Sequence, residues 1–166
     1  MTNRLAAYWV ALAIFAADQL TKWLVLGPLD LRNVGQITLL PIFNLTYTEN
    51  YGTAFGLFSA GSDAARWVLV AFTAAIAIGV AWWITREKEA GDKLALGLVL
   101  GGALGNITDR SRLGYVVDFA DLHFGEFRPF LIFNVGDAAI SIGVAILLLR
   151  AFLASRKRPE ENIDHA

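Results

Sequence analysis

The chain has 166 residues, of which 56% are hydrophobic and only 17% are charged, and its mean hydropathy is +0.52. An average soluble domain has about 25% charged residues, so this composition indicates a protein in contact with lipid. The net charge of −1 gives no basis for a nucleic-acid partner. Because the sequence contains no cysteine, it excludes disulfides, thiolate catalysis and zinc–thiolate sites.

Four apolar runs follow one another along the chain, at residues 5–26, 67–84, 94–107 and 130–149. A membrane-spanning helix needs about 20 mostly apolar residues, which the first, second and fourth runs provide. The third run is shorter and can span only if its helix continues to Arg112. We therefore predict a mainly α integral membrane protein with a single membrane-embedded domain, residues 1–154. It is a four-transmembrane-helix bundle with spans at about residues 5–26, 67–84, 94–112 and 130–152, followed by a charged, disordered cytoplasmic tail at 155–166.

The first run has a second interpretation, as a cleaved signal peptide. Arg4 would form its basic region and the Ala-Leu-Ala sequence at residues 11–13 its cleavage site. The apolar stretch continues well beyond that site, which favours a membrane-spanning helix.

Basic residues in the loops predict the orientation, because Lys and Arg are enriched on the cytoplasmic side of membrane proteins. With four spans and the N-terminus inside, eight of them lie on the cytoplasmic side and five lie outside. Both termini are therefore expected in the cytoplasm. The inner set is Arg4, Arg86, Lys88, Lys93, Arg150, Arg156, Lys157 and Arg158, and the outer set is Arg32, Arg66, Arg110, Arg112 and Arg128.

The two outer loops contain strand-like segments. Residues 37–48 have strand-like composition, and Pro41 within them suits an edge strand or a bulge. Tyr115, Val116 and Val117 form a second such segment. Together they predict a small extracytoplasmic β-sheet, with Asp118 in the loop that follows.

Ionisable residues within membrane spans are costly and are therefore functional candidates. In the predicted orientation, the polar residues of the first, third and fourth spans all lie toward the outer side. Carboxylates from three helices and one loop thus converge near the outer surface of the membrane. The residues concerned are Asp18 and Lys22 in the first span, Asn106, Asp109 and Arg110 in the third, Asn134 and Asp137 in the fourth, and Asp118 in the loop.

Asp18 and Lys22 are four residues apart, so they share a helix face and can pair. A structural salt bridge explains this pair as well as an active-site role does. Asn134, Asp137 and Ser141 are spaced to form one polar face of the fourth span, directed into the bundle. For Asp137, function is favoured over a carboxylate that is merely satisfied by backbone groups or by Arg110.

A stripe of small residues marks the third span. Gly97, Gly101 and Gly105 recur every fourth residue, which lets a second helix approach closely. Asp109 continues the same stripe toward the outer end of the span.

The sequence lacks the residues that several other hydrolytic mechanisms require. No G-x-S-x-G sequence is present, and a Ser/Lys dyad would require Lys22 beside Ser59 or Ser62. The two histidines, His123 and His165, form no H-E-x-x-H sequence for zinc.

Carboxylates remain as the candidate catalytic groups. Two neighbouring carboxyl groups cannot both ionise cheaply, so one retains a proton and the other acts as a base. Such a pair activates water and protonates the leaving amine without a cofactor. Asp118 and Asp137 form the best pair, because the chain between them is long enough to fold back.

Five short segments then give the sequence a family resemblance, and in this order they resemble lipoprotein signal peptidase, also called signal peptidase II. The similarity extends from about Leu5 to Leu149, with Gly136 as a departure because the family more often has alanine there. The segments are Asp18-Gln19-Leu20-Thr21-Lys22, Asn50-Tyr51-Gly52-Thr53-Ala54-Phe55-Gly56, Gly101-Gly102-Ala103-Leu104-Gly105-Asn106-Ile107-Thr108-Asp109-Arg110, Val116-Val117-Asp118-Phe119 and Phe133-Asn134-Val135-Gly136-Asp137.

The resemblance implies a multi-pass enzyme of the bacterial inner membrane, with its active site near the outer leaflet. Its substrates would be prolipoproteins cleaved before a cysteine that carries diacylglycerol. No cofactor is expected; membrane lipid and a globomycin-type inhibitor are expected to bind, and the protein is expected to be a monomer. By position, Asp118 and Asp137 match the catalytic dyad, Asn50, Asn106, Arg110 and Asn134 match the polar residues around it, and Asp18, Lys22, Gly52 and Asp109 match further motif positions.

Two other classes of protein remain as alternatives. A proton-coupled membrane transporter could use buried aspartates as a relay, but its polar faces would extend through the full depth of the membrane. Here the inner halves of the spans are almost wholly apolar. An intramembrane protease of the G-x-G-D kind would need glycine where Asn134 stands.

Overall fold

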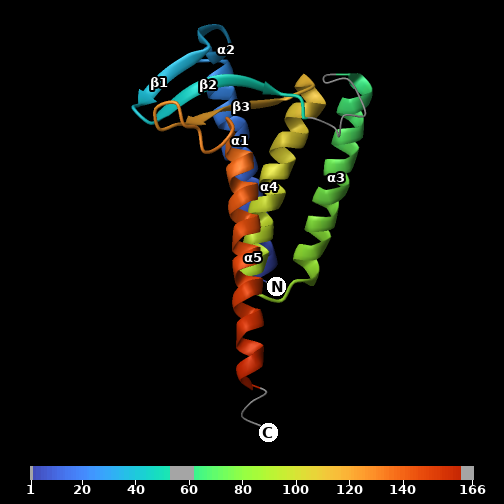
Figure 1. Cartoon of the computed structure of the whole chain (residues 1–166). Coiled ribbons are helices and arrows are strands. Elements are labelled where there is room, and N and C mark those ends of the chain that lie inside the picture. Colours follow the sequence, from blue (N-terminus) through green and yellow to red (C-terminus); the bar gives the residue numbers. More distant parts are fainter. Residues whose placement is uncertain (1, 53–61, 162–166) are drawn as a thin grey trace.

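The computed structural model describes residues 2–52 and 62–161. Four long helices account for most of them: α1 (Thr2–Leu26), α3 (Asp63–Arg86), α4 (Ala90–Leu113) and α5 (Val135–Glu161). Helix α4 is central and packs against the three others (Figure 1). Residues 53–56 of the second sequence motif, Ser59 and His165 lie outside the described residues.

Three of these helices have the length and composition of membrane spans. The apolar segments are Asn3–Leu26, Asp63–Arg86 and Val135–Arg156. Helix α4 is as long as α3, but it is less apolar because glycines and polar residues occupy much of its buried surface. The described chain therefore has three membrane-capable helices and a fourth helix packed among them.

The glycine stripe of α4 allows α1 to lie directly against it. A side chain at Gly101 would place its Cβ 2.5 Å from the carbonyl oxygen of Ala11, and one at Gly97 would collide with the backbone at Ala7. On another face of α4, a side chain at Gly102 would collide with the carbonyl oxygen of Gly136 in α5. The close approach predicted from the small-residue spacing is confirmed.

A small antiparallel sheet stands at one end of the bundle (Figure 1). Its strands are β1 (Gln36–Leu40), β2 (Phe43–Asn50) and β3 (Val116–Leu122), and the short helix α2 (Leu31–Val34) precedes β1. The single strand predicted around Pro41 is instead a hairpin, because Pro41 lies in the turn between β1 and β2. Asp118, predicted in a loop, lies within β3.

An apolar cluster fixes the sheet to the end of α1. Val25 of α1 and Leu31 of α2 pack with Leu45, Val117 and Phe119 of the sheet, and all five are buried. This packing holds β3 in place beside the C-terminal ends of α1 and α4.

Helix α5 begins later in the chain, and ends later, than the predicted fourth span. It begins at Val135 rather than near residue 130, because Asn134 caps it; residues 130–134 form the connection from the sheet. Asn134 therefore precedes the helix and does not share a helical face with Ser141. At the other end α5 continues to Glu161, so the start of the charged tail is helical rather than disordered.

Candidate functional site

The polar residues predicted from the sequence meet where the helix bundle joins the sheet. Asp18 and Lys22 come from α1, Asn106 and Asp109 from α4, Asp118 from β3, and Asn134 and Asp137 from the start of α5. Hydrogen bonds and ion pairs connect all seven into one network.

Asp118 is held in β3 by two amide groups. Asn134 donates a hydrogen bond from Nδ2 to Oδ1 of Asp118 at 2.7 Å, and Asn50 donates one to Oδ2 at 3.0 Å. The side chain is buried, with the residue 1% exposed. Burial, reinforced by the charge of Asp137, raises the pKa of Asp118 to about 6, although the two amide hydrogen bonds act in the opposite direction.

Asp137 lies in the first turn of α5 and takes part in a reciprocal cap. Its backbone N–H donates to Oδ1 of Asn134 at 2.8 Å, and its Oδ2 accepts from the backbone N–H of Asn134 at 3.3 Å. This is the arrangement of a capping box, with Asn134 before the helix and an acidic residue three positions later. The remaining oxygen, Oδ1, accepts a hydrogen bond from Asn106 at 2.7 Å.

A buried ion cluster lies next to the two aspartates. Lys22 pairs with Asp18 and with Asp109, each at 2.8 Å, and all three residues are almost fully buried. Asp18 also accepts the backbone N–H of Gly136 at 2.9 Å. Asp109 accepts the backbone N–H of Val117 at 3.2 Å, so the cluster ties α1, α4, β3 and α5 together.

Asn50, Gly52 and Arg110 form the side of the site nearest α3. The backbone N–H of Gly52 donates to Oδ1 of Asn50 at 3.0 Å, which turns the Asn50 amide toward Asp118. Gly52 has a φ of +68°, and a Cβ there would lie 2.6 Å from Leu69 and 3.6 Å from the Arg110 guanidinium. The positive φ favours glycine here, and a larger residue would also have to displace the end of the Leu69 side chain. Within the described residues, Nε of Arg110 is buried without a hydrogen-bond partner.

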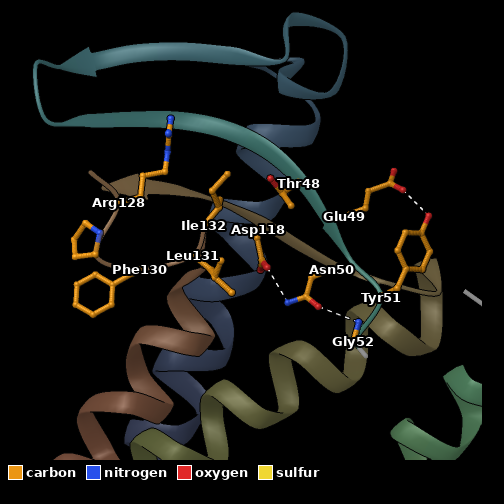
Figure 2. Close-up of a pocket in the computed structure, with 11 residues that line it drawn as sticks. Thr48, Glu49, Asn50, Tyr51, Gly52, Asp118, Arg128, Phe130, Leu131 and Ile132 are labelled. Carbon is orange, nitrogen blue, oxygen red and sulfur yellow. Dashed lines mark hydrogen bonds between the residues drawn. The ribbon is translucent and has the colours of Figure 1, made fainter. Parts of the chain in front are cut away.

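A cavity of about 790 Å³ opens between the sheet and the start of α5, with Asp118 and Asn50 in its wall (Figure 2). Residues 128–132 form its other side, and they were missed as part of the site because residues 130–132 were assigned to the fourth span and residues 128–129 to the loop before it. Pro129 and the Asn134-x-x-Asp137 cap are the sequence signals that place them before the helix. The lining residues are Thr48, Glu49, Asn50, Tyr51, Gly52, Asp118, Arg128, Pro129, Phe130, Leu131 and Ile132.

Asp121 was also missed, and it holds this second wall in place. Its carboxylate is buried, accepts a hydrogen bond from Thr46 at 3.0 Å and pairs with Arg128 at 3.1 Å. The sequence signal was a second aspartate three residues after Asp118.

A smaller cavity of about 180 Å³ lies between α3, α4 and α5. Thr73 and Ile76 of α3, Asn106 and Arg110 of α4, and Ile140 of α5 contribute to its lining. It joins the polar site to a mostly apolar space between helices. Across residues 2–52 and 62–161, no cluster of three or more acidic or histidine side chains is arranged to hold a metal ion.

Comparisons with known proteins identify relatives over nearly the whole chain. A family model described as signal peptidase (SPase) II matches residues 10–153. The chain is 55% identical to the lipoprotein signal peptidase of Rhizorhabdus wittichii over 98% of its own length and 95% of that protein, and 56% identical to that of Sphingopyxis alaskensis over 89% and 85%.

A solved structure of a bacterial membrane enzyme, determined by the in meso method at 2.3 Å resolution, is similar with a TM-score of 0.76. It is 26% identical in sequence, and the match covers 90% of this chain and 89% of that one. The relatives named are peptidases, so they give no support to the transporter alternative. The chain belongs to the signal peptidase II family, whose members are membrane aspartic peptidases.

Proposed function

We propose that this protein is an aspartyl endopeptidase that removes signal peptides from diacylglyceryl-modified prolipoproteins, cleaving before the lipidated cysteine. The observation that carries the proposal is that Asp118 and Asp137 are both hydrogen-bonded to Asn134, with Asp118 in the wall of a large cavity. The chain's lipoprotein signal peptidase relatives support the substrate class.

The two aspartates have different environments, which suggests different roles. Asp118 is buried and its pKa is raised, so it holds the shared proton. Asp137 is half-buried in the first turn of α5, where Asn106 and the backbone N–H of Asn134 hold its two oxygens in place, and the role of base falls to it. Asp137 then takes a proton from water as the water oxygen attacks the scissile carbonyl carbon, and Asp118 gives its proton to the carbonyl oxygen. When the C–N bond breaks, Asp137 gives its proton to the leaving amine and Asp118 takes a proton from a hydroxyl of the tetrahedral intermediate, which becomes the new carboxylic acid and restores the pair.

Arg110, Asn50 and Gly52 would bind the peptide backbone beside the dyad. The guanidinium of Arg110 carries an unused, buried N–H among the described residues, and a peptide carbonyl would satisfy it. The cavity walls formed by Phe130, Leu131 and other apolar residues suit the acyl chains of a lipidated cysteine.

The membrane arrangement completes the proposal. Helix α4 would be the fourth span, with its polar end and the sheet at the outer surface and both termini in the cytoplasm. Helices α3 and α5 both pack mainly on α4, and the cavity between them reaches Asn106 and Arg110. The apolar helix of the signal peptide would enter from the bilayer along this space.

The decisive experiment is incubation of the purified protein with a lipidated precursor, with cleavage read as a gel shift. A precursor whose cysteine is replaced by serine carries no diacylglycerol and is the matched substrate control. We expect cleavage of the lipidated form alone, persistence of cleavage with a chelator, and inhibition by globomycin. Loss of activity with a chelator that added metal restores would contradict the two-aspartate mechanism.

A further inference from the structure

The side-chain amides of Asn134 and Asn106 are oriented by neighbouring groups that can only donate hydrogen bonds. Oδ1 of Asn134 accepts the backbone N–H of Asp137, so Nδ2 of Asn134 must face acceptors. It donates to Asp118 at 2.7 Å and to Oδ1 of Asn106 at 3.2 Å. The orientation of Asn134 is thus set by the backbone of α5.

Asn106 is oriented from two sides. Its Oδ1 faces Nδ2 of Asn134 and also Nζ of Lys22 at 3.3 Å, and neither group can accept a hydrogen bond. Its Nδ2 consequently points to Asp137, at 2.7 Å. Rotating the amide by half a turn would place its NH₂ against the ammonium group and its oxygen against the carboxylate of Asp137.

Lys22 is itself fixed in position by charge. Asp18 and Asp109 hold its ammonium group from α1 and α4, each at 2.8 Å, and the residue is 3% exposed. A buried ammonium with two carboxylate partners has little freedom to move, and its third donor is directed to Asn106. The hydrogen bonds and ion pairs of Lys22 within the described chain reach Asn106 but neither Asp118 nor Asp137. Its charge also acts at longer range on Asp118, whose pKa it lowers.

We infer that Lys22 is a positioning residue for the reaction: acting through the amide of Asn106, it fixes the hydrogen bond that orients Asp137. This inference rests on the proposed function, and it gives the Asp18–Lys22–Asp109 cluster a role beyond joining helices. Without Lys22 the Asn106 amide keeps only its contact with Asn134 to define its orientation. The carboxylate of Asp137 would then be less well aligned with water and the scissile carbonyl.

A double-mutant cycle tests the inference. Lys22→Met combined with Asp109→Asn removes one buried charge of each sign, which limits the loss of stability. This charge-balanced variant and Asn106→Ala should each lower kcat by about 10- to 100-fold, the effect of losing a hydrogen bond to a charged group, and leave KM unchanged. The variant that combines Lys22→Met, Asp109→Asn and Asn106→Ala should lower kcat no further than the more damaging of these two variants does alone. The reason is that both variants act on one interaction.

Lys93→Met is the matched control. Lys93 is a second buried lysine, but it lies in α4, and its Nζ donates to the backbone oxygen of Lys88 at 3.0 Å, at the end of that helix remote from the site. We expect it to lower thermal stability without changing kcat per folded molecule. A similar loss of kcat in Lys93→Met would overturn the inference, because the effect would then be general destabilisation.

The outcomes separate the two proposals. If the wild-type protein does not cleave the lipidated precursor, the proposed function fails, and the role of Lys22 fails with it. If the wild type cleaves but the losses in kcat multiply, or the charge-balanced variant keeps full kcat, the inference about Lys22 alone is wrong.

Discussion

Asp118 and Asp137 are both acidic residues of one site, yet the chain surrounds them differently. Asp118 lies in a strand, buried and facing two side-chain amides, whereas Asp137 is half-buried in the first turn of a helix. Asn134 contacts both, through its side chain to one and through a reciprocal cap to the other. A change at one carboxyl group is therefore expected to disturb the chemistry of the pair as a whole.

The substitutions Asp118→Asn and Asp137→Asn test this coupling. Each keeps the side-chain shape and removes the ionisable group, so each should lower kcat by about 100- to 10,000-fold, as for loss of a general acid or base. The double variant should be hardly worse than either single one, because residues that act as a unit are non-additive. Turnover of a lipidated precursor by purified, folded protein measures the effect.

Asp63→Asn is the control for these two variants, because Asp63 lies at the start of α3 with its side chain 91% exposed. It should retain normal turnover. Near-normal turnover in Asp118→Asn or Asp137→Asn would remove that residue from the dyad.

The pH dependence of the reaction follows from the environment of Asp118. Burial and the charge of Asp137 raise the pKa of Asp118 to about 6, so the protonated form is favoured below this pH and is lost above it. If Asp118 supplies the proton, kcat/KM should fall as the pH is raised through about 6. A pH series on the wild-type enzyme checks this, and a rate that increases through the same range would assign the opposite roles to the two aspartates.

Helix α4 shows how a single element determines the spacing of the whole bundle. Its glycines place the backbone of α1 on one face and Gly136 of α5 on another. This contact brings Asn106 and Asp109 within hydrogen-bonding distance of residues from both neighbours. The same glycines help to explain why α4 is not among the three helices apolar enough by composition to cross a membrane.

Gly101→Ala tests the importance of this spacing. The new Cβ would lie 2.5 Å from the carbonyl oxygen of Ala11, so α1 and α4 must separate. We expect a loss of about 1–3 kcal/mol of stability from overpacking, with a lower melting temperature in detergent.

Gly79→Ala is the comparison, since a Cβ at Gly79 on α3 meets no atom within 4 Å. That variant should keep or raise the melting temperature, because alanine favours a helix more than glycine does. Equal melting temperatures for Gly101→Ala and the wild type would mean that the two helices tolerate a wider separation.

The elements that the sequence predicted well are those set by composition alone. Long apolar runs were enough to predict helices α1 and α3. Strand-like composition in the two predicted outer loops was enough to predict the sheet. The predicted start of α5 was wrong because residues 130–134 are mostly apolar, as a membrane span is. The cap at Asn134 that begins the helix depends on local hydrogen bonds, which composition does not reveal. The hairpin at Pro41 was missed because a proline suits a turn as well as an edge strand.

The site was predictable as a set of residues but not as a geometry. Alternating helix directions were enough to place Asp18, Asp109 and Asp137 at the same end of the helix bundle. The joint hydrogen bonding of Asn134 to Asp118 and Asn106 depends on backbone turns that no spacing rule specifies. The cavity wall at residues 128–132 likewise depends on the Asp121–Arg128 pair across the loop.

At the scale of the whole molecule, the ends of the helices define two sides. The connection between α3 and α4 and the late part of α5 lie at the end of the bundle remote from the sheet (Figure 1). Reporter fusions after Lys88 and after Ser155 should therefore read cytoplasmic, in agreement with the distribution of basic residues. A fusion near Gly125, in the turn after β3, should read extracytoplasmic.

An extracytoplasmic reading after Ser155 would require an odd number of spans. It would exclude α4 as the fourth span and would separate the carboxylates in depth. Agreement at all three positions would support both the four-span arrangement and the outer location of the site.

The cavity between α3, α4 and α5 has a consequence for kinetics. If substrate arrives sideways through this space, enzyme and precursor meet by diffusion in two dimensions, and encounter depends on substrate per unit area of membrane. In mixed micelles, adding detergent at fixed total substrate would then dilute the precursor within the micelle surface and slow cleavage. KM for this enzyme would be a mole fraction in the lipid or detergent phase rather than a molar concentration in water.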